Sequence, residues 1–252
     1  MRPTIAALLS SLLWSAILAQ GKSLSPTETA LQFYRALRDK RYVEGFSRSV
    51  YRGAVEGLTP DDLRDLEPDF VRTFSSIPPK FEPGEQKVEG DDATVLLMFE
   101  GIDEPQPVVL VKVSGEWLVG DRDALAAVKE QGRAFFFNTR MSVNEAEAYD
   151  LLLRIISAQM LYGQRHGGVQ IPLSEMIKRG AIPKDVEDGR ASGYQLKITL
   201  SADIKSFSAI ATPDAYGKTG RLSFYADSGG VRAEDLKGQP ATVRSPVYRP
   251  QK

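Results

Sequence analysis

The sequence contains no cysteine and only one histidine, His166. Missing thiols exclude disulfide bonds, thiolate nucleophiles and metal sites built on thiolates, so stability must come from packing. A transition-metal site would depend almost entirely on carboxylates. Neither sign of charge dominates, because 32 basic and 33 acidic residues leave a formal charge of −1. We therefore expect no nucleic-acid partner and no attraction to an anionic membrane surface.

Long apolar runs are also missing, apart from one at the amino terminus. There a positive charge precedes an apolar stretch from Ile5 to Leu18, and small residues follow. This pattern predicts a cleavable signal peptide over residues 1–21, cut after Ala19 or after Gly21. The stretch is short for a membrane span of about 20 residues, so retention as an anchor is the less favoured alternative. We expect a secreted or periplasmic protein of a bacterial envelope, with no stable membrane span after cleavage.

After the predicted signal peptide, the first patterns in the sequence are those that begin helices. Ser25 and Thr59 each place a capping side chain directly before a proline, which predicts a helix beginning at each point. A short helix is expected between them, from Tyr42 to Val55. Pro68 should bend or divide the helix that follows Thr59.

Strand signals come next, in four segments rich in valine, leucine and aromatic residues: 86–90, 93–101, 106–115 and 116–121. Short turns containing glycine and aspartate separate them, which favours an antiparallel meander. Helices followed by such a sheet predict an α+β domain over residues 25–121.

This first half resembles the nuclear-transport-factor-2-like superfamily, whose members fold a curved sheet around helices into a cone. The opening "SPTETALQFYRALRDKRYVEGF" and the closing "VKVSGEWLVGD" carry the resemblance. It implies a ligand pocket inside the cone, for which the candidate lining is aromatic: Phe33, Tyr34, Phe46, Phe70, Phe74, Phe99 and Trp117. The alternative is that these rings only fill the core. Enzymes of the superfamily usually place a histidine or aspartate in the pocket, and here no histidine precedes His166.

A connecting helix and linker are predicted for residues 122–142. Three consecutive phenylalanines, Phe135, Phe136 and Phe137, cannot all face one core. At least one of them is therefore expected to contact the neighbouring domain or a partner protein.

The second half opens with a predicted helix capped by Asn144. A polar stripe at helical spacing runs along it, and apolar residues occupy the rest of its circumference; the stripe is Glu147, Asp150, Arg154, Ser157 and Gln164. Acids in that stripe argue against a membrane-surface helix and favour packing under a sheet. His166 is either a metal ligand or general base, or an ordinary helix end before two glycines; we favour the helix end.

A small helix and three strands follow, and the order resembles the globular domain of bacterial type IV pilin-like proteins and pseudopilins. The resemblance rests on "NEAEAYDLLLRIISAQMLYGQRHGG", "SGYQLKI" and "FSAIATPDAYGKTGRLSFYADSGGVR", with Phe224, Asp227, Gly230 and Arg232 in the last segment. It implies a long helix packed on a small antiparallel sheet over residues 143–235, followed by an extended tail over 236–252. Neither a Gly-Phe cleavage site nor a long apolar helix precedes Asn144, so an ordinary filament subunit is not expected.

Other acidic groups offer little chemistry. Asp227, Glu234 and Asp235 are candidates for a calcium loop, but "DSGG" lacks the alternating acids of such a loop, which favours a surface turn. Ser228 would need the helix-end His166 to act as a nucleophile. We predict no catalytic residue, no metal and no cofactor. The expected function is an exported, non-catalytic accessory or protein-binding module whose partner is an envelope, secretion or pilus protein. The alternative is a periplasmic small-molecule-binding protein or a degenerate enzyme that uses the cone.

Overall fold

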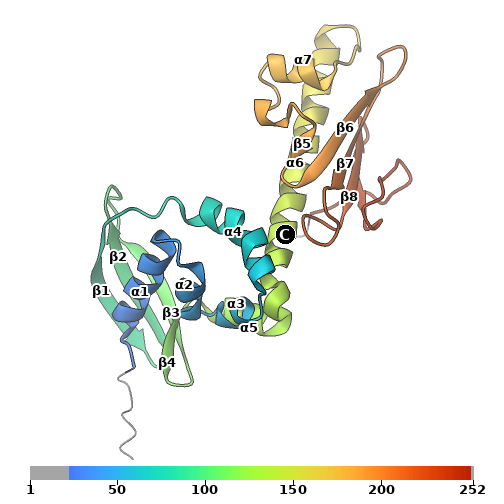
Figure 1. The fold of residues 1–252 in the computed structure, drawn as a ribbon. Coiled ribbons are helices and arrows are strands. Elements are labelled where there is room, and N and C mark those ends of the chain that lie inside the picture. The colour runs from blue at the N-terminus through green and yellow to red at the C-terminus, as the bar shows by residue number, and fades with distance from the viewer. Residues whose placement is uncertain (1–22, 251–252) are drawn as a thin grey trace, which may run out of the picture.

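The computed structural model describes residues 23–250. The signal peptide predicted for residues 1–21 lies outside this range. The described chain forms two lobes joined by one long helix (Figure 1). Helices combine with two antiparallel sheets, which confirms the predicted α+β class. Within residues 23–250, no helix has the length and apolar content needed to cross a bilayer.

The first lobe begins with four helices: α1 (Pro26–Arg38), α2 (Tyr42–Ser47), α3 (Arg52–Glu56) and α4 (Pro60–Phe74). Ser25 and Thr59 cap α1 and α4 through reciprocal side-chain and backbone hydrogen bonds, as predicted. The single helix expected from Tyr42 to Val55 is wrong. Between α2 and α3 the backbone of Ser49 forms a parallel bridge with Val119, and a residue cannot pair with a strand and continue a helix.

Pro68 does not divide α4, which runs unbroken from Pro60 to Phe74. A proline inside a helix removes one backbone hydrogen bond. Here Leu66 and Phe70 are buried on either side of it. Packing of these two side chains holds both turns against the lobe.

The sheet of the first lobe contains β1 (Phe81–Glu89), β2 (Asp92–Phe99), β3 (Gln106–Val113) and β4 (Glu116–Val119), paired in chain order. This confirms the predicted antiparallel meander. β1 starts at Phe81 rather than at Gln86, because an irregularity between Pro83 and Gln86 shifts the register while pairing with β2 continues on both sides. The face toward α1 forms the core, with Val95, Leu97 and Leu110 fully buried.

The connection between the lobes differs from the predicted linker. α5 (Arg122–Gln131) is followed by Gly132, whose φ of +52° turns the chain into the short η1 (Gly132–Ala134). α6 (Phe135–Arg165) then runs for 31 residues from the first lobe into the second (Figure 1). The helix start predicted at Asn144 is wrong. Asn144 is buried in the middle of α6, and its Nδ2 donates a hydrogen bond to the Thr219 carbonyl at 2.9 Å.

The second lobe contains α7 (Leu173–Lys178), η2 (Lys184–Val186), β5 (Arg190–Ala191), β6 (Tyr194–Leu200), β7 (Phe207–Pro213), β8 (Ser223–Asp227) and β9 (Gly230–Glu234). The five strands pair antiparallel in chain order. The last predicted strand is in fact two, β8 and β9, because the chain turns between Asp227 and Gly230.

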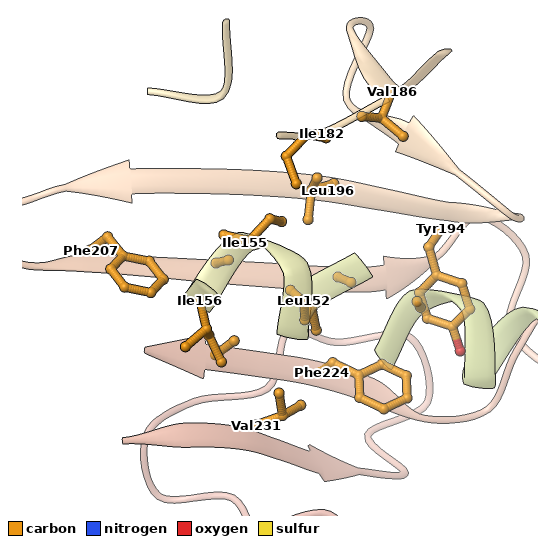
Figure 2. Close-up of a cluster of buried hydrophobic side chains, with 14 of the residues drawn as sticks. Leu152, Ile155, Ile156, Ile182, Val186, Tyr194, Leu196, Phe207, Phe224 and Val231 are labelled. Atoms are coloured by element: carbon orange, nitrogen blue, oxygen red, sulfur yellow. The ribbon is translucent and has the colours of Figure 1, made fainter. Parts of the chain in front are cut away.

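One face of α6 packs on this sheet. Figure 2 shows Leu152 and Ile155 directed at the strands, where they meet Leu196, Phe207 and Phe224. At 25 cal/mol per Å², each such buried leucine or isoleucine contributes about 2 kcal/mol of burial free energy. This packing agrees with the predicted arrangement of a long helix on a small sheet.

The carboxyl-terminal segment extends the second lobe beyond the predicted boundary at residue 235. It turns back along β9, where the Ala233 amide donates to the Pro246 carbonyl and the Tyr248 amide to the Val231 carbonyl, each at 3.0 Å. The Tyr248 ring lies edge-on to Phe224, with centroids 5.3 Å apart. The segment predicted as an extended tail therefore packs on the second lobe.

An ionic cluster ties the two lobes together where α4 meets α6. The Arg140 side chain is only 9 % exposed, and it donates from Nη1 to Asp65 Oδ1 at 3.0 Å and from Nε to Asp69 Oδ2 at 2.5 Å. Lys218, on the loop between β7 and β8, completes the cluster with Asp65. The second lobe is thus held to α4 as well as through α6.

Candidate functional site

The aromatic residues predicted to line a pocket lie in and around the core of the first lobe. Phe33, Phe46, Phe70 and Phe99 are buried, and the other three are partly buried. Apart from Trp117, these rings pack against one another at edge-on angles; Phe46 and Phe70, for example, have centroids 5.1 Å apart. Phe70 and Trp117 also border cavities that open at the surface. The placement favours the core-filling alternative, and a ligand pocket among the rings stays a prediction.

The three consecutive phenylalanines begin α6, and all are partly buried. Phe136 enters the first-lobe core, 5.0 Å from Phe46 between ring centroids, and Phe135 lies against Tyr51. The Arg140 guanidinium lies over the Phe137 ring, with Cζ 5.4 Å from the ring centroid. The triplet therefore anchors α6 to the first lobe. Its expected contact with a partner protein stays a prediction.

His166 ends α6, as the sequence predicted. Its Nδ1 lies 2.8 Å from the Tyr162 carbonyl, and its ring stacks on the Tyr162 ring with centroids 3.8 Å apart. Gly167 follows with φ of +65°, and the Gly168 amide donates to the Gly163 carbonyl, which closes the helix end. The contacts of the imidazole are thus with Tyr162, one turn earlier in α6.

The three carboxylates considered for calcium have separate local partners. Asp227 accepts a hydrogen bond from the Gly229 amide in the β8–β9 turn, at 2.7 Å. Glu234 accepts from the Ser245 hydroxyl at 2.8 Å, and Asp235 lies beside Lys237. Among residues 23–250, no group of three or more histidines and carboxylates is arranged to hold a metal ion.

Two open cavities border α6 in the second lobe. The larger, about 620 Å³, lies between α6 and the carboxyl-terminal segment. Glu145, which lines this cavity, accepts hydrogen bonds from the Arg221 and Leu222 amides at 2.7 and 3.2 Å. These bonds hold the segment before β8 against α6. The smaller, about 400 Å³, is lined by the carboxylates of Glu147, Asp150, Asp185 and Asp188 and the guanidiniums of Arg154 and Arg190.

Sequence reasoning missed an exposed apolar surface on α6. Leu153, Met160 and Leu161 are 38 %, 52 % and 57 % exposed, on the side of the helix turned away from the sheet. Because residues three, four, seven and eight apart share a helix face, these three side chains form one stripe, hereafter the exposed stripe. The signal in the sequence was their position beside the polar residues Ser157 and Gln164, which are also exposed.

Comparison of the chain with known protein families, with curated proteins and with solved structures gives no match.

Proposed function

We propose that this chain is a non-catalytic accessory protein of the bacterial envelope that binds a protein partner through the exposed stripe of α6. The observation that carries the proposal is the exposure of Leu153, Met160 and Leu161 together on one helix face. A grouped apolar surface on a water-soluble lobe is a typical feature of an interaction site, whereas scattered apolar residues are ordinary.

The geometry of α6 favours a partner with an apolar or amphipathic helix. At 1.5 Å per residue, the 31 residues of α6 extend over about 46 Å. Side-chain ridges on such a helix accept the ridges of a second helix, and three apolar anchors give the contact its stabilising burial. Ser157 and Gln164 lie among them and offer hydrogen bonds at the rim.

The resemblance of the second half to pilin-like domains supports a pilus or secretion protein as the partner. In pilin-like proteins the long helix packs against other subunits in the fibre. In the described part of the chain, α5 and the first lobe precede Phe135, so α6 carries no apolar helical extension there. A role beside such an assembly therefore fits better than a role as a repeating subunit.

The absence of catalysis is part of the proposal, and the use of His166 supports it. Its imidazole is committed to the Tyr162 carbonyl and ring. Burial raises the pKa of the buried Tyr194, which keeps its hydroxyl protonated. That hydroxyl donates to the Leu222 carbonyl at 2.9 Å, a structural role.

Capture from the native envelope tests the proposal. Tagged chain is crosslinked in cells and recovered in three forms: the natural sequence, a variant with Met160→Ser and Leu161→Ser, and a control with Ile204→Ser and Val243→Ser. The control residues are exposed apolar residues of the same lobe outside the stripe. We expect the natural and control chains to recover the same pilus or secretion component, and the stripe variant to lose it. Equal recovery by all three chains, or recovery of no such component by any, contradicts the proposal.

A further inference from the structure

A small cavity of about 190 Å³ opens in the first lobe, far in sequence from the exposed stripe. It lies between the start of α1, the α2–α3 connection and β4. Its lining is Ser23, Leu24, Thr29, Arg48, Arg52, Glu116 and Trp117. Two of its side chains are guanidiniums, which is a high density of positive charge for so small a space.

The Arg48 side chain is the unusual group of this cavity. Its Nε is buried and has no hydrogen-bond partner, and no ion pair with Arg48 is found within residues 23–250. In the same range, two other side-chain atoms are buried and lack a hydrogen-bond partner: Gln170 Oε1 and Ser223 Oγ. Both belong to neutral groups. A buried donor without a partner is costly, and more so when it is charged.

The position of Arg48 is fixed by the fold rather than by a partner of its side chain. The Arg48 carbonyl accepts a hydrogen bond from the Val119 amide, and the Val50 amide donates one to the Val119 carbonyl. Both hydrogen bonds are 2.9 Å long. These bonds lock the backbone of the α2–α3 connection against β4. The backbone of Arg48 is therefore fixed beside the cavity that its side chain lines.

Arg52 is oriented at the same cavity by two contacts. Its Nε donates to the Ser47 carbonyl at 2.8 Å, and its Nη1 donates to Glu116 Oε2 at 2.9 Å. Glu116 thus offsets one of the two guanidiniums, and the lining keeps one net positive charge. Lys112 adds a further ammonium nearby, 5.5 Å from the centroid of the Trp117 ring.

We propose that this cavity binds a small anion bearing a carboxylate or a phosphate, with Arg48 as its principal ligand and Arg52 as the second. A planar guanidinium presents paired N–H donors that match either group, and the Arg48 side chain lines the cavity without an ion-pair partner among residues 23–250. The space accommodates a small anionic group with ordered water. It excludes a nucleotide or a large cofactor.

Titration calorimetry of the exported full-length chain with sodium phosphate and, separately, with sodium acetate tests this site. We expect saturable binding of at least one probe at 1:1 stoichiometry, and the stronger probe identifies the group. Arg48→Gln should weaken binding by at least about tenfold, as expected for loss of a charge-assisted hydrogen bond. Arg48→Lys should retain part of the affinity, because it keeps the charge but loses the fork.

Two further variants separate a specific site from general attraction of anions. Glu116→Gln removes the one acid among the described lining residues and should increase the affinity. Arg64→Gln removes an exposed arginine of α4 outside the cavity and should leave it unchanged. Circular dichroism checks that each variant is folded. No saturable binding of either probe to the natural chain, or equal weakening by Arg48→Gln and Arg64→Gln, overturns the proposal.

Discussion

Lys218 Nζ lies 2.9 Å from Asp65 Oδ2, although 153 positions separate these residues in the chain. The contact joins the β7–β8 loop of the second lobe to α4 of the first. Asp65 also accepts from Arg140 on α6, so one carboxylate connects three elements. The two lobes and α6 therefore form one connected frame, which fixes where the exposed stripe lies relative to the first lobe.

Arg140 is the residue on which this frame most depends. Arg140→Ala leaves Asp65 and Asp69 facing each other without their shared cation and uncovers the Phe137 ring. We expect a loss of about 2 kcal/mol in the free energy of unfolding, below the range for fully buried pairs because both carboxylates are partly exposed. Urea denaturation measures it. Arg72→Ala, which removes a more exposed arginine 3.6 Å from Asp69, is the control and should change little.

The pH dependence of stability should report on Asp65. Burial raises the pKa of this carboxyl, but hydrogen bonds from Lys218 and Arg140 outweigh burial and hold it below the ordinary value of 3.8. A depressed pKa in the folded state means that the contribution is fully present above about pH 4 and is lost as the pH falls through the lowered pKa. Thermal melts between pH 7 and pH 2.5 should show the advantage of the natural chain over Asp65→Asn shrinking only below about pH 4. A constant difference across the range contradicts this assignment.

Gln159 holds the chain that leaves α6. It is fully buried, and its amide donates to the Ile171 carbonyl at 2.8 Å and accepts from the Ile171 amide at 2.9 Å. Gln159→Met keeps the volume but leaves two buried backbone groups unpaired, which should cost about 2 kcal/mol or more. Gln164→Met on the exposed side of the same helix is the matched control. If both variants unfold at the same urea concentration, the buried amide pair has no such role.

The sequence predicted those features that depend on neighbouring residues. The caps at Ser25 and Thr59 and the helix end at His166 are decided within one turn of helix, and each was predicted correctly. The start of α6 was predicted incorrectly. Asn144 is a residue type that caps helices, but its side-chain amide instead donates to the distant Thr219 carbonyl.

The exposed stripe was missed for a related reason. The helical wheel of α6 shows apolar residues around most of its circumference, and the packing of the whole second lobe decides which of them are covered. Leu152 is covered and Leu153 is not, although the two are adjacent. The buried, unpartnered Nε of Arg48 likewise depends on the pairing of the α2–α3 connection with β4, which no local pattern in the sequence indicates.

Photo-crosslinking from a single position on α6 is the most direct test that this helix binds a partner protein. A photoreactive residue replaces Met160 within the exposed stripe, and in a second chain it replaces Thr199, which is exposed on β6. Irradiation in the native envelope followed by mass spectrometry should give a crosslink to a pilus or secretion component from position 160 and none from position 199. Crosslinking to that component from both positions, or from neither, would contradict the central claim.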